Sequence, residues 1–305
     1  MSQKRALLVR AGALGDVLLL RASLHALRAG GWAVTLLVPA RSGSVLLGPG
    51  EAEALIDWER ADVAALLAAG PPPPALCALL AGFEAAVVYS RQVALAEALR
   101  AIVPRVVAHD PAPPADTHAA AWLWQGVRAL GAPWVEMPEP LLFTGDEARA
   151  AGSLVERLPP RFLAVHPGSG SPAKNWPAPR FAALAAALAG GKPFLAIAGP
   201  ADGAGTALLG AVPGARVAGE LPPRVLGALL QRAGLYVGND SGVTHLAAAA
   251  GARTLALFGP TDPAQWTPVG RAVRTVGAAS GAMEDLTLEA VRDAVRRWDD
   301  EAATP

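Results

Sequence analysis

Short runs of apolar residues alternate with longer segments of helical periodicity along the first half of the chain. Apolar runs at residues 5–10 and 33–39 predict buried strands, and leucines at helical spacing predict a helix over 17–28. Further strands are expected at 54–58, 85–90 and 105–108, and further helices near 62–69, 93–101 and 117–130. Near-continuous apolar strands separated by helices are typical of a parallel sheet that helices cover on both faces.

The pattern breaks between residues 131 and 160, where five prolines predict a connector with one short helix over 146–157. The alternation then restarts, with strands expected at 162–166, 194–198, 216–218, 235–238 and 254–258, and helices at 179–189, 201–209, 223–233, 242–250 and 284–298. The chain is therefore predicted to form two doubly wound α/β domains, residues 1–158 and 159–305. Ligands of such sheets bind outside the carboxyl ends of the strands, so a cleft between the two domains is the expected site.

Composition narrows the classes of function. The 305 residues include 26 basic and 26 acidic side chains, whereas a nucleic-acid-binding protein normally has a basic excess. No uninterrupted run of 20 apolar residues is present, so no membrane span is predicted. The single Cys77 excludes a disulfide framework and a cysteine metal cluster, and the first apolar run is too short for a signal peptide. A cytoplasmic protein without a nucleic-acid partner is expected.

The first candidate site follows the first predicted strand, where residues 11–16 read AGALGD. Two glycines allow the backbone to approach a ligand closely, and Asp16 stands at the start of a helix. A carboxylate there either caps the helix by accepting amide protons or acts as a general base, and the two roles are compatible. The loop lacks G-x-G-x-x-G spacing and no acidic residue ends the second strand, which argues against a nicotinamide-binding site.

Two loops of the second half carry the other candidates. Residues 166–177 read HPGSGSPAKNWP, in which Lys174 either lies in solvent or places a cation beside a phosphate, and Trp176 is expected to pack. Residues 238–245 read GNDSGVTH and open a helix whose amino terminus is suited to phosphate. Either Asp240 or Ser241 caps this helix, or Asp240 accepts sugar hydroxyls, and Ser241 and His245 share one helical face.

Two other chemistries are disfavoured by the spacing of residues. A serine-hydrolase nucleophile elbow needs G-x-S-x-G, which the stretch around Ser241 does not provide. The nearest approach to an Asp-x-Asp metal motif is Asp57-Trp58-Glu59, which is expected to form a turn at a strand end. No metal site is therefore predicted.

Together these motifs are similar to those of glycosyltransferase family 9, the ADP-heptose:lipopolysaccharide heptosyltransferases. The resemblance runs nearly end to end and is carried by LLVRAGALGDVLLL, by HPGSGSPAKNWP with the following PRFAALAAAL, and by GNDSGVTHLAAAAGARTLALFGPTDPAQW. It implies a GT-B fold, in which two Rossmann-like domains face a central cleft. The carboxy-terminal domain would bind the nucleotide sugar, the amino-terminal domain would face the acceptor, and the last helix would pack back on the amino-terminal domain.

The matching motif positions also imply roles for single residues. Asp16 would be the catalytic base, and Lys174 would act on the donor phosphates and take part in catalysis. The implied donor-binding residues are Gly15, His166, Gly168, Ser169, Lys174, Trp176, Gly199, Asp240, Ser241, Gly242, His245 and Gly259.

The implied reaction is inverting transfer of a sugar, heptose from ADP-heptose, to a hydroxyl of a lipopolysaccharide core or related saccharide. Neither a metal nor another cofactor is expected to take part. Lipid-linked acceptors of this kind lie at the inner membrane, which leaves peripheral contact with its cytoplasmic face open. Two alternatives also remain open: a catalytically silent nucleotide-sugar-binding protein, and a different Rossmann-type enzyme that uses a nucleotide.

Overall fold

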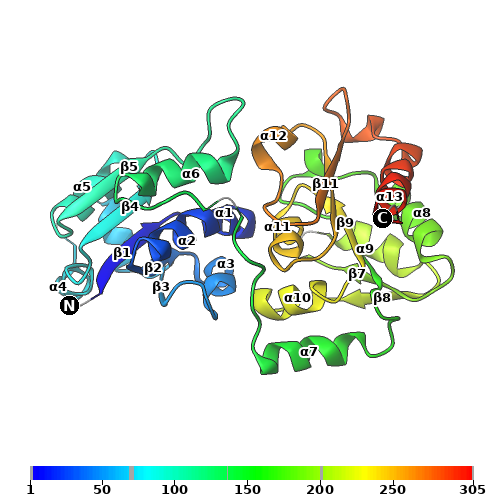
Figure 1. Cartoon of the computed structure of the whole chain (residues 1–305), viewed down its shortest axis with the longest axis horizontal. Helices are drawn as coiled ribbons and strands as arrows, with labels where there is room; N and C mark the ends of the chain where they lie inside the picture. Colours follow the sequence, from blue (N-terminus) through cyan, green and yellow to red (C-terminus); the bar gives the residue numbers. More distant parts are fainter. Residues whose placement is uncertain (1–2, 69–71, 136, 200–201, 304–305) are drawn as a thin grey trace. The chain divides into compact units, whose positions relative to one another are not determined.

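The structure, a computed structural model, describes residues 3–68, 72–135, 137–199 and 202–303. The chain divides into two compact units, Met1–Leu142 and Phe143–Pro305. Each unit contains one parallel sheet with helices packed on both faces (Figure 1). The prediction of two doubly wound α/β domains is confirmed.

The first unit has a five-stranded sheet in the order β3-β2-β1-β4-β5. Its strands are β1 (Lys4–Val9), β2 (Trp32–Val38), β3 (Ala54–Asp57), β4 (Ala85–Tyr89) and β5 (Arg105–His109). Its helices are α1 (Leu14–Leu19), α2 (Arg21–Ala29), α3 (Ala40–Gly43), α4 (Pro74–Leu80), α5 (Val93–Arg100) and α6 (Ala119–Arg128), with 3-10 turns η1 (Ser44–Leu46) and η2 (Val63–Leu67). Leu7 and Val9 of β1 pack with α4 and α5, and the Tyr89 hydroxyl donates to the Leu123 carbonyl (2.7 Å) on the opposite face. This packing fixes the carboxyl end of β1, from which the loop to α1 begins.

The helices of the first unit differ from the prediction in three places, apart from the four-residue α3, which was also not predicted. The helix expected over 17–28 is divided at Leu20, because the Leu20 amide donates to Val17 three residues back and tightens the turn. A short 3-10 turn, η2, replaces the helix expected near 62–69. Helix α4 was not predicted, and Pro74 occupies its first helical position, where no amide hydrogen is needed.

The second unit has a six-stranded parallel sheet in the order β11-β10-β9-β6-β7-β8. Its strands are β6 (Leu163–His166), β7 (Phe194–Ile197), β8 (Ala215–Ala218), β9 (Leu235–Asn239), β10 (Thr254–Phe258) and β11 (Val273–Gly277). Its helices are α7 (Gly145–Val155), α8 (Ala178–Ala189), α9 (Gly203–Gly210), α10 (Pro223–Leu230), α11 (Gly242–Ala249), α12 (Pro263–Trp266) and α13 (Leu288–Ala303), with 3-10 turns η3 (Pro172–Lys174) and η4 (Met283–Asp285). Side chains of α8, α9 and α13 form one apolar core with the sheet.

The boundary between the units lies at Leu142/Phe143, whereas the sequence predicted it at 158/159. The difference concerns α7, which the prediction assigned to the connector. Thr144 and Glu147 form a capping box that starts this helix. Glu147 also binds Arg224 of α10, with 2.5 Å between Arg224 Nε and Glu147 Oε1, and this pairing joins α7 to the second unit.

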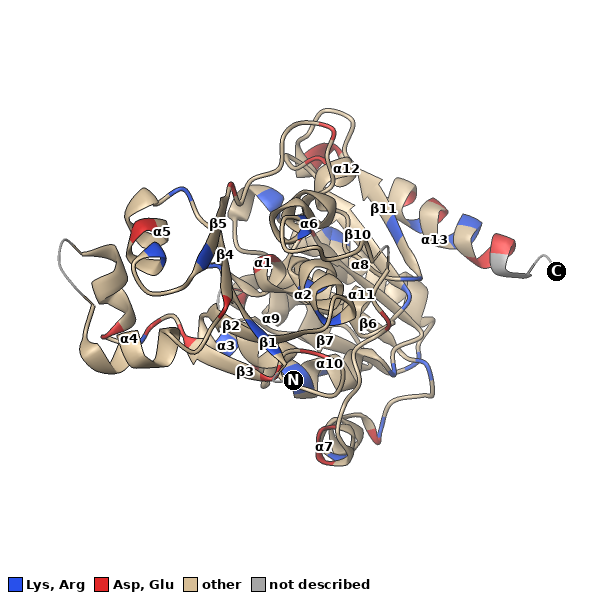
Figure 2. Ribbon diagram, turned by 60° about the vertical axis from the view of Figure 1, so that its left-hand side comes forward, with Lys and Arg blue, Asp and Glu red and all other residues tan. Residues whose placement is uncertain are grey.

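The carboxy-terminal part adds one strand that the sequence did not predict. β11 is an edge strand whose residues are half-exposed, so its sequence lacks the apolar run that marks the buried strands. Helix α13 packs on α8 and β11 within the second unit. Figure 2 shows basic and acidic residues interspersed along the elements of both units. None of the helices in the described ranges is long and apolar enough to cross a membrane.

Candidate functional site

The strand ends of the second sheet bring the two predicted loops together. In the parallel register, His166 at the end of β6 lies beside Gly238 of β9, and Asn239 lies beside Leu257 of β10. The loops that follow β6, β9 and β10 therefore leave the sheet at the same edge. The candidates Lys174, Asp240 and Gly259 belong to these three loops.

Asp240 is the centre of a polar cluster built from four segments. Its Oδ2 lies 2.8 Å from Lys174 Nζ, and the Thr261 hydroxyl donates to the same oxygen (2.8 Å). His245 Nε2 is 3.8 Å from the other carboxylate oxygen. Asp240 and His245 are buried, whereas the Lys174 side chain keeps 31% of its surface exposed. Lys174 is therefore the charged side chain of the cluster that is accessible to a ligand.

The cluster keeps the carboxyl of Asp240 charged. Burial alone would raise the pKa of Asp240, but its contacts with His245, Lys174 and Thr261 outweigh burial and lower that pKa to about 2. Asp240 is thus ionised at neutral pH, and its charge is balanced by Lys174. Any anion that binds Lys174 competes with this carboxylate.

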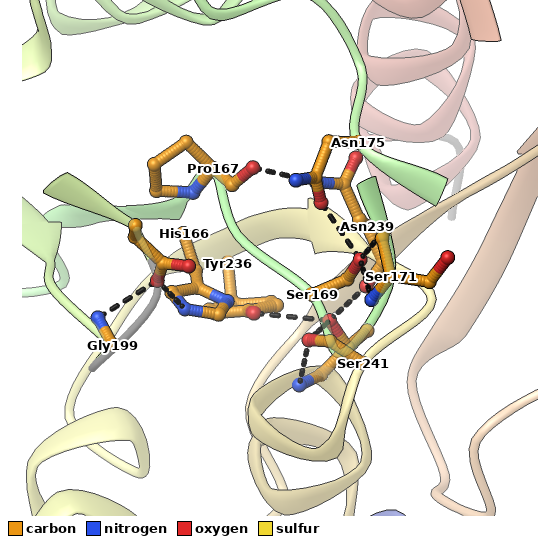
Figure 3. Close-up of polar contacts among 11 residues, drawn as sticks. His166, Pro167, Ser169, Ser171, Asn175, Gly199, Tyr236, Asn239 and Ser241 are labelled. Carbon is orange, nitrogen blue, oxygen red and sulfur yellow. Dashed lines mark hydrogen bonds and ion pairs between the residues drawn. The ribbon is translucent and has the colours of Figure 1, made fainter. Parts of the chain in front are cut away.

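Asn239 holds the loop that carries Lys174. Its side chain is fully buried, and its Nδ2 donates to the Pro167 carbonyl (2.7 Å) while its Oδ1 accepts the Trp176 amide (3.0 Å). One amide group therefore fastens both ends of the 167–176 loop. Inside the loop, the Ser169 hydroxyl lies 2.7 Å from Asn175 Oδ1, as Figure 3 shows. Asn239 was not among the predicted site residues, although it precedes Asp240 directly.

Ser241 starts α11 as its N-cap. The Ser241 hydroxyl accepts the Thr244 amide (3.4 Å), so the capping interpretation left open by the sequence applies to this serine. Gly242 is the first residue of the helix. The amide groups of the first turn thus lie directly after Asp240 in the chain.

His166 takes part in a second buried pair that the sequence did not predict. Its Nε2 lies 2.8 Å from Asp202 Oδ2, which also accepts the Gly199 amide (2.7 Å). A Cβ at Gly168 or Gly199 would overlap the Asp202 carboxylate, so both glycines make room for it. Burial raises the pKa of Asp202, but His166 and the Gly199 amide outweigh burial and lower it. His166, Gly168 and Gly199 therefore hold Asp202 in place, and no local sequence signal marked that aspartate.

Two other candidates serve packing in the second unit. Trp176 is 1% exposed, donates its indole N–H to the Leu286 carbonyl (2.6 Å) and packs edge-to-face on Phe181. This agrees with the packing interpretation of Trp176. A Cβ at Gly259 would lie 2.6 Å from the Met283 side chain, so Gly259 allows η4 to approach β10.

Asp16 and Gly15 lie on α1 of the first unit, whereas the other candidates belong to the second unit. The Asp16 carboxylate accepts the Ala13 amide at Oδ2 (3.1 Å) and pairs with Arg10 at Oδ1, 2.6 Å from Arg10 Nη2. A Cβ at Gly12 would lie 2.6 Å from Asp16 Cβ, so this position requires glycine. Asp16 thus caps the first turn, yet 38% of its side chain stays exposed.

The candidate aspartates differ in their freedom to act. Asp240 is enclosed by protein groups, whereas Asp16 keeps an accessible edge. Asp57 accepts the Ala40 and Glu59 amides (2.9 and 3.2 Å), in agreement with a strand-end turn. The described ranges contain no group of three or more His, Cys, Asp and Glu side chains arranged to hold a metal ion.

The sequence of the second unit is similar to that of a known protein family. The sequence profile of a family described as glycosyltransferase family 9 (heptosyltransferase) matches residues 128–294. Among curated proteins, none matches the chain by sequence.

Several solved structures share the fold of the whole chain. A glycosyltransferase family 9 protein from Veillonella parvula DSM 2008 has 18% identity and a TM-score of 0.80, covering 98% of this chain and 97% of that one. ADP-heptose lps heptosyltransferase II of E. coli has 20% identity and a TM-score of 0.76, covering 97% and 99%. E. coli heptosyltransferase WaaC, solved with ADP-2-deoxy-2-fluoro heptose, has 18% identity and a TM-score of 0.69, covering 96% and 99%. The two units thus have the GT-B arrangement of elements that the sequence resemblance implied.

Proposed function

Because the chain belongs to glycosyltransferase family 9, the heptosyltransferase family, we propose that it transfers heptose from ADP-heptose to a saccharide hydroxyl. The acceptor is proposed to be a lipopolysaccharide core or a related lipid-linked saccharide, and the reaction to be inverting and independent of metal. The observation that carries the proposal is the Lys174–Asp240 pair, which lies within the matched region and at the start of α11.

Lys174 and the first turn of α11 are proposed to bind the donor diphosphate. Lys174 is the exposed cation of the cluster, and amide groups at a helix amino terminus favour anions. When the diphosphate takes Lys174, the ionised Asp240 is left free to accept a sugar hydroxyl. E. coli heptosyltransferase WaaC, which shares the fold, was solved with a nucleotide sugar of this chemical class, ADP-2-deoxy-2-fluoro heptose.

Asp16 is proposed to be the general base. It takes the proton of the acceptor hydroxyl while that oxygen bonds to the anomeric carbon and the bond from that carbon to the diphosphate breaks. A single displacement of this kind inverts the configuration at the anomeric carbon. The negative charge that leaves with ADP is stabilised by Lys174 and the α11 amides. We also propose that the protein works in the cytoplasm, at the face of the membrane where lipid-linked acceptors lie.

The identity of the donor is tested by measuring the melting temperature of the protein with different nucleotide sugars. A ligand present at 100 times its Kd stabilises the folded protein by about 2.7 kcal/mol. We expect ADP-heptose to raise the melting temperature more than UDP- or GDP-sugars at equal concentration. A larger shift with a UDP- or GDP-sugar would contradict the proposed donor, and release of ADP on longer incubation distinguishes an enzyme from a silent binding protein.

A further inference from the structure

Arg10 is a buried cation whose side chain reaches the candidate base. It follows β1 directly, is 4% exposed, and pairs through Nη2 with Asp16 Oδ1 (2.6 Å). We infer that Arg10 is a positioning residue that fixes the orientation of the Asp16 carboxylate for proton transfer. This inference rests on the proposed role of Asp16 as the base.

The contacts of Asp16 leave one edge of its carboxylate free. Arg10 holds Oδ1, the Ala13 amide holds Oδ2, and Gly12 lies against the side chain. Each oxygen has therefore one protein donor and a further lone pair. The exposed 38% of the side chain is the part available to an acceptor hydroxyl. Without Arg10, only the hydrogen bond from the Ala13 amide would hold the carboxylate, and the Asp16 side chain could change its orientation.

The hydrogen bonding of β1 and the cap of α1 do not depend on the charge of Arg10. Its backbone amide, not its side chain, continues the sheet by donating to Leu37 (3.1 Å). The first turn of α1 is already capped through Ala13. Arg10 Nη1 is buried and has no hydrogen-bond partner in the described part of the chain, which is unfavourable for a guanidinium.

Two other buried arginines, Arg21 and Arg224, are bound differently. Arg21 donates from two nitrogens to Glu51 and also to the Glu139 carbonyl, and Arg224 binds Glu147 through two nitrogens. Each of these arginines thus binds structural partners through two nitrogens. Arg10 instead directs one nitrogen to a half-exposed aspartate, which points to a role at that aspartate.

The test replaces Arg10 by methionine, which has a similar length and no charge, and by lysine, which keeps the charge. We expect Arg10→Met to lower kcat by about 10- to 100-fold with donor KM changed less than about twofold, since misplaced catalytic groups cost this much. Arg10→Lys should recover part of the loss. The matched control is Arg60→Met, which removes an exposed arginine–aspartate pair of the same unit and should leave kcat unchanged.

A double-mutant comparison separates positioning from a purely structural role. In the Asp16→Asn background, adding Arg10→Met should lower kcat no further, because the group that it positions is already lost. Losses that multiply, or an Arg10→Met kcat within about twofold of the unmodified protein, would overturn the inference. If the melting curve shows that Arg10→Met is unfolded, the kcat of Arg10→Lys is used instead. A kcat of Arg10→Lys equal to that of the unmodified protein would overturn the inference. An active Asp16→Asn protein would instead overturn the proposed base itself.

Discussion

Asp16→Asn is expected to lower kcat by about 100- to 10,000-fold, the usual contribution of a positioned general base. Asparagine has nearly the same shape and still accepts the Ala13 amide, so the cap on α1 remains. It cannot take a proton from a sugar hydroxyl. Donor affinity should stay within about twofold, because the proposed diphosphate ligands belong to the second unit.

The control for this change is Asp57→Asn. Asp57 is another aspartate of the first unit whose carboxylate accepts backbone amides at a strand end. It has no proposed part in the reaction, so its replacement should leave kcat unchanged. Steady-state kinetics on both variants gives kcat, and calorimetric titration with the donor gives its Kd. An Asp16→Asn enzyme with near-normal kcat would show that another group accepts the proton.

Lys174→Met is expected to raise the Kd of the donor by about 10- to 150-fold. A hydrogen bond to a charged group contributes about 1.5–3 kcal/mol, and each 1.4 kcal/mol is tenfold in affinity. The change also leaves the ionised Asp240 without its cation, so the remaining site repels a diphosphate. The kcat should fall as well, because Lys174 is proposed to stabilise the leaving diphosphate.

Lys192→Met provides the matched comparison for Lys174. Lys192 is an exposed lysine of the same unit, just before β7 at the amino end of the sheet, away from the strand ends that carry Asp240. Its replacement should leave the donor Kd unchanged. Equal effects of the two substitutions would mean that general positive charge, rather than the Lys174 contact, governs donor binding.

The sequence predicted the fold well where local signals are strong. Buried strands such as β1 and β4 have continuous apolar runs, and both were predicted within one residue of the bounds that the structure gives. The unit boundary depends instead on the packing of α7 against α10, whose residues lie far away in the chain. β11 was missed for a similar reason, since an edge strand is stabilised by its neighbour rather than by its own apolar pattern.

The candidate site could be predicted in part. The motifs located Lys174 and Asp240, and the rule for parallel sheets placed their loops at one edge. They did not indicate that the two side chains pair, because that contact depends on the loop conformation held by Asn239. Asp202 was missed because its partner, His166, lies 36 residues away in the chain. Arg10 was missed because its contact with Asp16 depends on how the chain turns between β1 and α1. The roles assigned to Asp16 and to the donor-binding residues remain predictions.

The central proposal is a single displacement in which Asp16 is the base and no metal takes part. Its most direct test is the configuration of the glycosidic bond formed from ADP-heptose on a lipopolysaccharide-core saccharide, read by NMR with EDTA present. The expected result is transfer in EDTA with the anomeric configuration inverted relative to the donor. Retained configuration, or transfer that stops in EDTA and returns with Mg²⁺, would contradict the proposal.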